Sequence, residues 1–214
     1  MDFKEINKET YNIISKEWET KRDYYWDHIV DFLKSFENKE NINFLDLGCG
    51  SGRNLELAKE LGFKNILGCD FSKELLKICE NKGFRTNLSD LEKLNIEDNS
   101  QDLIICIAAH HHLLEKEQQI NSLKEMRRIL KENGRILLAN WFPSDEFILK
   151  AKEKGKFIFI DKQKVEVYFQ YKRKKYNRYY YLFKEEELID LCKEVSFKIN
   201  STSEFKGNLY LELS

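Results

Sequence analysis

The sequence predicts an α/β fold, in which one domain is built on a mostly parallel sheet with helices on both faces. Three observations predict it. The chain has 214 residues, which is an ordinary length for one domain. Apolar strand-like segments alternate with amphipathic helical segments over about 100 residues, as they do in parallel sheets. A glycine-rich turn at residues 48–52 joins the first such strand to the first such helix.

The first 38 residues are expected to be helical, because apolar residues recur there at spacings of three and four. They are Tyr11, Ile14, Trp18, Trp26, Ile29, Val30 and Leu33. Strands and helices then alternate. Strands are expected at 43–47, 65–69, 84–87, 102–109 and 135–141, and helices at 52–61, 73–82 and 115–131. Ser72 is expected to cap the helix at 73–82, and Asn133-Gly134 to end the one at 115–131.

The last third of the chain has a different pattern. It predicts a β-hairpin over residues 156–171, a helix at 184–194, and strands at 197–201 and 209–213. A short loop containing Gly207-Asn208 joins the last two strands, so we expect them to pair antiparallel.

Composition excludes several classes of protein. With 42% hydrophobic and 13% aromatic residues the chain is not disordered. Its longest apolar runs, such as 103–109, are too short to span a membrane, and no apolar leader follows Met1. The five cysteines are widely spaced without a Cys-x-x-Cys pair, so we expect buried free thiols, no metal and a cytoplasmic protein.

The glycine turn carries the first functional signal. Gly48, Gly50 and Gly52 form G-x-G-x-G, not the G-x-G-x-x-G that cradles a dinucleotide pyrophosphate. Asp46, just before it, would repel a phosphate but could accept from an ammonium group. Asp70 ends the second strand, where a ribose-binding carboxylate belongs in this topology.

A third carboxylate, Asp90, follows the third strand and is well placed for an adenine amino group. A nucleoside that bears an amino acid and no phosphate satisfies all three carboxylates, and S-adenosylmethionine is such a molecule. A bare glycine turn in an unrelated α/β fold and a dehydrogenase are the competing interpretations. The missing third-glycine spacing counts against the dehydrogenase.

The residues D-L-G-C-G-S-G, then C-D-F-S, then S-D-L resemble the motifs of class I S-adenosylmethionine-dependent methyltransferases in order and spacing. The resemblance implies a Rossmann-like fold whose mostly parallel seven-stranded sheet has an antiparallel last strand and an inserted β-hairpin. It also implies S-adenosylmethionine as cofactor. The cofactor-binding residues that we expect are Tyr11, Asp46, Gly48, Gly50, Gly52, Asp70, Phe71, Ser89, Asp90, Leu91 and Ala108.

Three consecutive histidines, His110, His111 and His112, end the fourth strand of the core. In open α/β sheets ligands lie beyond the carboxyl ends of strands, so the triplet faces the cofactor or the acceptor. Metal binding is disfavoured, since consecutive side chains point in different directions. A structural role and a role in the methyl-acceptor pocket remain, and we favour the pocket for His111 and His112.

The stretch I-A-A-H-H-H-L, the helix K-E-M-R-R-I-L-K-E-N-G-R and the tail R-Y-Y-Y-L-F-K-E-E-E-L-I-D-L resemble the tRNA wobble-uridine carboxymethyl methyltransferases. That family methylates the carboxylate of 5-carboxymethyluridine in the anticodon. The resemblance covers nearly the whole chain. Two departures lie on the substrate side: Tyr25 stands where the family usually has proline, and Val167-Tyr168-Phe169 replaces a Val-Pro-Trp element.

The resemblance implies residue roles on the acceptor side. His111, His112 and Arg178 are expected to position the acceptor, with no general base, because a carboxylate is already ionised at pH 7. The residues expected to bind the substrate are Arg22, Trp26, Trp141, Lys174, Lys175, Tyr179 and Tyr180.

Charge is distributed unevenly along the chain, and this favours an RNA acceptor independently. The formal net charge is −1, but residues 150–184 carry twelve Lys and Arg against three Asp and Glu. That segment therefore has a net charge of +9, which leaves −10 for the rest. The aromatic residues that interleave with these cations include Tyr168, Phe169, Tyr171, Tyr176, Tyr179, Tyr180 and Tyr181. Cations bind phosphates and aromatic rings stack on unpaired bases, whereas a solvated lysine face is the competing interpretation.

We expect a single domain over 1–214 with four regions. They are N-terminal helices that cap the site (1–40), a cofactor-binding core (41–142), a basic aromatic insertion on the substrate side (143–183), and a closing helix and strands (184–214). A small-molecule methyltransferase and a non-catalytic cofactor-binding subunit are the alternative functions. Besides tRNA, the resemblance implies a small zinc-binding activator protein as partner, added to a sheet edge at 65–69 or 84–87. No membrane partner is expected.

Overall fold

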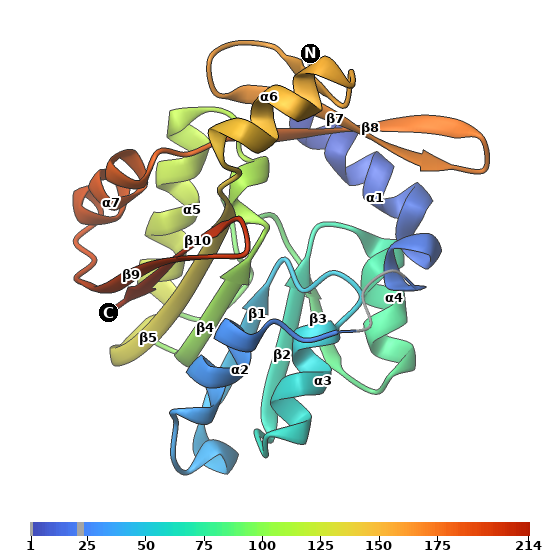
Figure 1. The fold of residues 1–214 in the computed structure, drawn as a ribbon. Helices are drawn as coiled ribbons and strands as arrows, with labels where there is room; N and C mark the ends of the chain where they lie inside the picture. Colours follow the sequence, from blue (N-terminus) through green and yellow to red (C-terminus); the bar gives the residue numbers. More distant parts are fainter. Residues whose placement is uncertain (1, 21–23) are drawn as a thin grey trace.

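The computed structural model describes residues 2–20 and 24–214. Its main sheet has seven strands in the order β3-β2-β1-β4-β5-β10-β9 (Figure 1). The bounds are β1 (Asn43–Leu47), β2 (Asn65–Asp70), β3 (Arg85–Leu88), β4 (Gln101–Ile107), β5 (Leu130–Trp141), β9 (Ile199–Phe205) and β10 (Asn208–Leu213). The first five run parallel, and β10 runs antiparallel to both of its neighbours. The predicted fold class is therefore confirmed.

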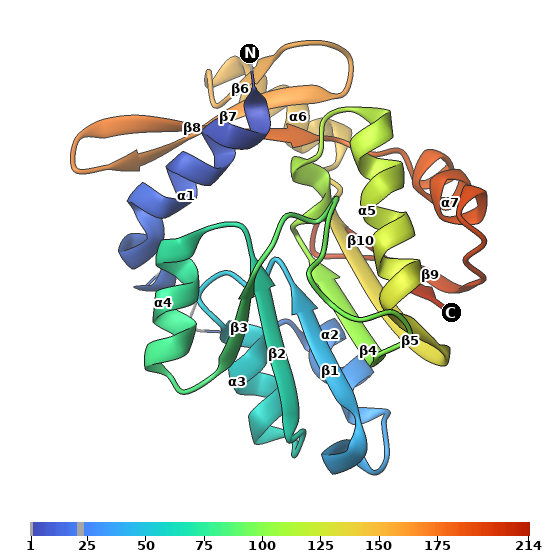
Figure 2. The ribbon, with the colours of Figure 1, turned by 180° about the vertical axis from the view of Figure 1, so that it is seen from behind.

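Helices cover both faces of this sheet (Figures 1 and 2). On one face, α2 (Asp27–Lys34), α3 (Arg53–Glu60) and α4 (Lys73–Asn81) pack over side chains such as Phe44 and Tyr210. On the other, α5 (Lys116–Ile129) and α7 (Glu185–Glu194) cover Leu45 and its neighbours. Phe44 and Leu45 point to opposite faces because side chains alternate along a strand. Both faces of β1 are buried, which explains why its apolar residues Phe44, Leu45 and Leu47 do not alternate with exposed polar ones.

The N-terminal helix α1 (Phe3–Thr20) does not cover a face of the sheet. It crosses the carboxyl ends of the parallel strands and packs between α4 and a second, three-stranded sheet (Figure 2). Tyr11 and Ile14 are its buried apolar residues, as the helical periodicity predicts. This position makes α1 a cover over the edge where ligands bind in α/β sheets.

The second sheet consists of β6 (Phe157–Phe159), β7 (Lys164–Tyr171) and β8 (Lys174–Tyr181). The hairpin expected over 156–171 is confirmed, since β6 and β7 pair antiparallel, but the strand β8 was not expected and pairs with β7 along its whole length. Lys172 and Arg173 make the turn with φ of +47° and +63°. Two positive φ angles are typical of a type I′ turn, which usually carries Asn-Gly and therefore hid this turn in the sequence. Helix α6 (Asp145–Glu153) precedes the sheet and was not expected.

Two further boundaries differ from the prediction. Helix α5 ends at Ile129, and β5 begins at once with Leu130, which pairs with Gln101. Asn133-Gly134 consequently lies in an irregular part of β5 and does not end the helix. Strand β4 ends at Ile107, before the predicted limit, because Ala108 adopts a φ of +55°.

The remaining expectations concern edges, thiols and membranes. The edge strands are β3 and β9, so residues 84–87 mark an edge as predicted, whereas 65–69 lie in the interior strand β2. All five cysteines are buried free thiols. In residues 2–20 and 24–214, no helix combines the length and apolar character that a membrane crossing requires.

Candidate functional site

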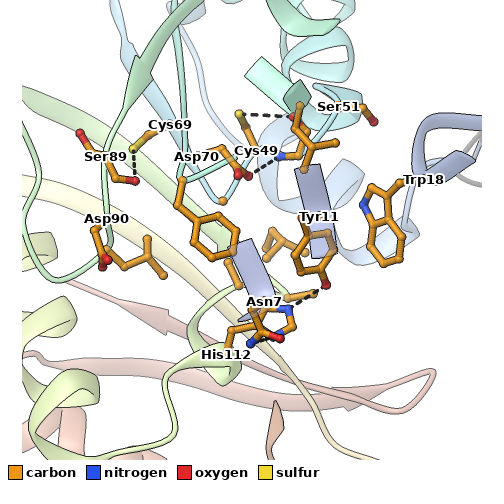
Figure 3. A pocket seen from close by; sticks show the side chains of 18 of the residues that line it. Asn7, Tyr11, Trp18, Cys49, Ser51, Cys69, Asp70, Ser89, Asp90 and His112 are labelled. Carbon is orange, nitrogen blue, oxygen red and sulfur yellow. Dashed lines mark hydrogen bonds between the residues drawn. The ribbon is translucent and has the colours of Figure 1, made fainter. Parts of the chain in front are cut away.

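A pocket lies at the carboxyl ends of β1, β2 and β4, beneath α1 (Figure 3). Ten of the predicted site residues line it: Tyr11, Gly48, Gly50, Asp70, Phe71, Ser89, Asp90, Leu91, Ala108 and His112. They come from five separate segments of the chain. The fold therefore brings together most of the cofactor residues that the motifs indicated.

The glycine turn leaves room for a ligand because its backbone adopts conformations that other residues disfavour. Gly48 has a φ of +76°, and a Cβ built on it would lie 2.3 Å from the Cβ of Ala109. Gly50 has a φ of +56°. The N–H groups of Gly48 and Cys49 both donate to the carbonyl of Cys69, at 2.7 and 3.0 Å. The turn is thereby held against the end of β2 and presents bare backbone to the pocket.

Asp70 closes the turn from the other side. Its Oδ2 accepts from the Gly50 N–H at 2.9 Å, and its Oδ1 accepts from the Ser72 N–H at 2.8 Å. Burial raises the pKa of Asp70 to about 6, although hydrogen bonds from backbone N–H groups act in the opposite direction. Each oxygen keeps a further lone pair, so the carboxylate can still accept from ligand hydroxyl groups.

Two predicted cofactor residues lie outside the pocket wall. Asp46 is fully buried in β1, its oxygens have no hydrogen-bond partner in the described chain, and burial raises its pKa to about 7. Gly52 begins α3, and a Cβ on it would lie 3.0 Å from the Sγ of Cys79. Neither residue is therefore in the place that the motif predicts for a ligand contact. Asp46 lies behind the wall and interacts electrostatically with Arg53, which lines the pocket, and Gly52 allows close packing of the start of α3 on α4.

Asp90 lies at the opposite end of the pocket from the glycine turn (Figure 3). Lys4 from α1 forms ion pairs with Asp90 at 2.8 Å and with Glu92 at 2.6 Å. Lys4 itself lines the pocket. One end of α1 is thus fixed to the loop that follows β3.

The three histidines have three different environments. His110 is fully buried, stacks on Phe183, and has its pKa lowered to about 4 by burial. The Trp141 N–H donates to His111 Nδ1 at 2.9 Å, and His111 is absent from the pocket wall. His112 reaches the pocket, where its Nε2 lies 2.9 Å from the hydroxyl of Tyr11. His112 therefore lies in the wall of this pocket and His111 lies behind it, against the backbone of β5, while the acceptor-side roles expected for both stay predictions.

Arg178 in β8 is buried next to this pocket. Its guanidinium lies over three rings, 5.2 Å from the centroid of Trp18, 5.4 Å from Phe169 and 5.5 Å from Tyr180. Its Nε has no hydrogen-bond partner among the described residues. Burial lowers the pKa of this group, but interactions with Tyr180 and Tyr11 raise it above its ordinary value. Arg178 is therefore a buried cation held by aromatic faces.

The other predicted substrate residues are dispersed. Trp26 packs beside Arg53 near the start of α2 and is not part of the pocket wall, and Trp141 packs against Phe157 and Tyr180. Lys174 and Lys175 are exposed at the tip of the β7–β8 hairpin. Tyr180 borders His112, and the Tyr179 hydroxyl donates to Glu166 at 3.0 Å. Arg22 lies outside the described residues.

Sequence reasoning missed several residues of the pocket wall: Lys4, Asn7, Trp18, Cys49, Ser51, Arg53, Asn54, Cys69, Leu75, Ile107, Ala109 and Leu113. One signal could have found some of them. Lys4, Asn7 and Trp18 recur with Tyr11 at helical spacing, so a helix that places Tyr11 in the pocket places them there too. In the described part of the chain, no group of His, Cys, Asp and Glu could hold a metal ion.

Several known proteins are similar to this chain in sequence. A putative methyltransferase of Encephalitozoon cuniculi is 32% identical over 192 residues, which are 88% of this chain and 85% of that protein. The tRNA (carboxymethyluridine(34)-5-O)-methyltransferase ALKBH8 of Macaca fascicularis is 31% identical over 150 residues. That match covers 70% of this chain but only 21% of the relative, so the chain spans about a fifth of that longer protein.

Solved structures share the fold. An S-adenosylmethionine-dependent methyltransferase from Clostridium acetobutylicum superimposes with a TM-score of 0.68 at 20% identity, covering 94% of this chain and 96% of that one. The putative methyltransferase in a complex with the Haloferax volcanii Trm112 methyltransferase activator gives a TM-score of 0.72 at 16% identity, over 97% and 96%. Residues 45–138 match the family model described as a methyltransferase domain.

The pocket fits the cofactor of that family. Asp70 and Asp90 offer acceptors for ribose hydroxyls and an adenine amino group, and Gly48 and Gly50 present bare backbone to the pocket. Tyr11 and Trp18 add apolar walls (Figure 3), and Phe71 adds another. S-adenosylmethionine is the cofactor, and the chain belongs to the class I S-adenosylmethionine-dependent methyltransferases, among which it is similar to the tRNA carboxymethyluridine methyltransferases.

Proposed function

We propose that this methyltransferase acts on tRNA and esterifies the carboxylate of 5-carboxymethyluridine at the wobble position of the anticodon. The similarity to ALKBH8 supports this, since that relative is named for the same reaction. So does the similarity over 136 residues, at 32% identity, to a protein of Arabidopsis thaliana with the same name. The acceptor side of the structure supplies the physical argument.

The observation that carries the proposal is the buried guanidinium of Arg178. It is only 9% exposed, and no acidic side chain among the described residues forms an ion pair with it. A buried cation without a counter-charge is costly, so such a site favours an anionic ligand. The guanidinium fork can donate two parallel hydrogen bonds to a carboxylate. Arg178 lies beside Tyr11 and Trp18, which line the cofactor pocket, and a carboxylate held there would be next to the cofactor.

The β7–β8 hairpin supplies a surface for RNA. Lys172, Arg173, Lys174 and Lys175 are all exposed at its tip. Lys175 lies 4.0 Å from the centroid of the Tyr168 ring, so cation and aromatic face are presented together. Phosphates bind such cations, and unpaired bases stack on such rings. The hairpin lies beside α1 at the pocket end of the molecule (Figure 1), so the anticodon loop could contact both.

The chain needs no general base for this reaction. S-adenosylmethionine supplies an electrophilic methyl group when it is bound. A carboxylate acceptor is ionised at neutral pH and carries its own nucleophilic oxygen. The work of the protein is then to align two reactants and exclude water. Arg178 orients the carboxylate, Tyr180 and Trp18 keep water from its guanidinium, and α1 covers the cofactor.

A labelled-cofactor assay tests the proposal. The purified protein, with and without a co-expressed activator, is given tRNA that carries 5-carboxymethyluridine and matched tRNA with unmodified uridine. We expect label only in the modified tRNA, as an ester that mild alkali removes. Equal labelling of both tRNAs, or labelling of neither, would contradict it. Accumulation of 5-carboxymethyluridine in cells that lack the protein is the corresponding result in vivo.

We also propose that an activator protein pairs with the free edge of β3. That strand ends the sheet, and Leu88 on it is 49% exposed. An edge strand offers unpaired backbone groups to a partner strand. Leu88→Asp is expected to abolish co-purification with an activator of the Trm112 type, whereas Phe205→Asp on the opposite edge strand is the matched control. Equal binding by the two variants would place the partner elsewhere.

A further inference from the structure

A chain of hydrogen bonds connects strand β8 with the cofactor pocket through His112. The Nδ1 of His112 lies 2.8 Å from the carbonyl oxygen of Tyr179, and its Nε2 lies 2.9 Å from the hydroxyl of Tyr11 (Figure 3 shows the Tyr11 end). A carbonyl oxygen only accepts hydrogen bonds, so Nδ1 must carry the proton. In the neutral ring Nε2 then has a lone pair and must accept, and the Tyr11 hydroxyl donates to it.

Asn7 of α1 fixes the far end of this chain. Its Oδ1 accepts from the Tyr179 N–H at 2.8 Å, and its Nδ2 donates to the Tyr179 carbonyl at 3.0 Å. The side-chain amide thus pairs with both backbone groups of one residue, as a neighbouring strand would. Because its oxygen is committed to the N–H, the orientation of the amide is fixed. Asn7 Nδ2 and His112 Nδ1 therefore donate to the same carbonyl, which has two lone pairs.

This arrangement determines which part of the Tyr11 hydroxyl faces the ligand. Its proton points to His112, so the lone pairs of its oxygen remain for other groups. Tyr11 lines the cofactor pocket and interacts with Arg178. We propose that Asn7 and His112 are positioning residues that hold the Tyr11 oxygen as an acceptor between two positive charges, Arg178 and the cofactor, and that Tyr11 thereby selects the cationic cofactor over its neutral product.

The physical reason is electrostatic. S-adenosylmethionine carries a positive sulfonium, and the thioether left after methyl transfer is neutral. Without an acceptor between them, the buried guanidinium and the sulfonium would repel one another across a medium of low polarity. An oriented phenol oxygen reduces that repulsion and gives nothing comparable to the thioether. This selectivity concerns the cofactor and not the tRNA. Its test therefore needs no methyl-accepting substrate and can fail independently of the proposed function.

The tautomer of His112 is the first test and requires no variant. Nitrogen chemical shifts of the histidine rings, measured by NMR on protein labelled with nitrogen-15 histidine, distinguish a protonated Nδ1 from a protonated Nε2. The chain has four histidines, so His112→Gln assigns the signal by its loss. We expect a protonated Nδ1 and an unprotonated Nε2. A protonated Nε2 would overturn the proposal, since Tyr11 would then accept from His112.

The second test is cofactor discrimination. Dissociation constants for S-adenosylmethionine and S-adenosylhomocysteine are measured by calorimetry on the wild type and on Tyr11→Phe. We expect Tyr11→Phe to weaken S-adenosylmethionine binding by about tenfold and S-adenosylhomocysteine binding by less than about twofold. Tyr25→Phe is the matched control, because its hydroxyl donates to Glu60 outside the pocket. Equal weakening of both ligands by Tyr11→Phe would overturn the proposal.

Asn7→Leu tests the positioning role, because leucine has a similar size and no polar group. If the variant folds, we expect the His112 nitrogen signals to shift toward a mixture of tautomers and the preference for S-adenosylmethionine to fall part of the way to that of Tyr11→Phe. Unchanged signals and an unchanged preference would remove Asn7 from the chain. If Asn7→Leu does not fold, two measurements still decide the proposal. They are the tautomer of His112 in the wild type and the effect of Tyr11→Phe on S-adenosylmethionine binding relative to S-adenosylhomocysteine binding.

Discussion

The Oδ2 of Asp70 accepts a hydrogen bond from the N–H of Gly50 at 2.9 Å, which joins the end of β2 to the turn after β1. The same carboxylate also accepts from the Ser72 N–H at the start of α4. One side chain therefore orders the glycine turn and the next helix while it forms part of the pocket wall. Loss of its charge affects both the shape of the pocket and its acceptors.

Asp70→Asn is expected to weaken S-adenosylmethionine binding strongly. Its amide has only one oxygen, so it cannot accept from Gly50 and Ser72 and also from two ligand hydroxyls. A lost hydrogen bond to a charged group costs about 1.5–3 kcal/mol, so the dissociation constant should rise at least about tenfold by calorimetry. Asp31→Asn, at an exposed site on α2, is the matched control. An unchanged affinity would exclude Asp70 from the binding site.

Cofactor binding should depend on pH because the carboxylate of Asp70 is the form that accepts. Burial raises the pKa of Asp70 to about 6. Below that pH the free protein is protonated there, so affinity should fall by about tenfold between pH 7 and pH 5. In Asp70→Asn this part of the dependence should disappear. An affinity that is flat across this range in the wild type would contradict the assignment.

The stability of the free protein should show the opposite trend. The folded pKa of Asp70, about 6, and that of Asp46, about 7, both lie above the ordinary value of 3.8, and burial is the main cause of each shift. The folded state then binds more protons than the unfolded state between pH 4 and 7, so the free energy of unfolding contributed by these groups falls as pH rises through that range. Urea denaturation of wild type and Asp46→Asn at pH 5 and 8 measures this. The gain in stability from Asp46→Asn should be larger at pH 8.

Gly48→Ala separates close packing from backbone strain. The new Cβ would meet Ala109 at 2.3 Å, whereas a Cβ at Gly62, which also has positive φ, would meet nothing within 4 Å. Left-handed backbone costs about 1–2 kcal/mol for residues with a Cβ, so Gly62→Ala should lower the free energy of unfolding by about that much. Gly48→Ala should lower the free energy of unfolding by about 1–3 kcal/mol more, because overpacking adds to the strain. This variant should also bind the cofactor poorly. Similar losses for the two variants, measured by urea denaturation, would contradict this explanation.

The sequence predicts the core of the fold well because its strands are short apolar runs between amphipathic helices. It fails where local signals mislead. Lys172-Arg173 forms a turn usually made by Asn-Gly, so β8 was not recognised as a strand. Asn133-Gly134 resembles a helix end but lies in an irregular part of β5. In both cases, pairing with another strand overrides the local preference.

The sequence motifs located Asp70, Asp90 and the glycine turn of the pocket. These residues follow predicted strands, and ligands of α/β sheets bind at the carboxyl ends of strands. The motifs could not show that Asp46 lies behind the turn, or that His111 accepts from the Trp141 N–H. Asn7 carries no motif at all. Its function depends on the position of α1 against β8, which involves residues 172 positions apart in the chain.

The hairpin should determine the salt dependence of tRNA binding. Lys174→Gln with Lys175→Gln removes two exposed cations from its tip. If both contact phosphates, the slope of log affinity against log salt should decrease in magnitude by about 1.4. Cofactor binding should remain unchanged. The matched control is Lys124→Gln with Lys193→Gln, on α5 and α7. An equal decrease of the slope in both double variants would indicate non-specific attraction of tRNA to a charged surface.

Arg178→Lys should separate acceptor positioning from cofactor binding. Lysine keeps the positive charge but lacks the planar fork that donates twice to a carboxylate, and it stacks less well on Trp18, Phe169 and Tyr180. Misalignment of the acceptor by about an ångström can cost a hundredfold, so the rate of methyl transfer to 5-carboxymethyluridine tRNA should fall by about that factor. The dissociation constant for S-adenosylmethionine should change by less than about threefold. The guanidinium of Arg127, on α5, lies 5.9 Å from the centroid of the Phe197 ring. Arg127→Lys therefore tests for a general effect of replacing an arginine that stacks on a ring. Full activity in Arg178→Lys would show that charge alone is enough, and that another residue orients the carboxylate.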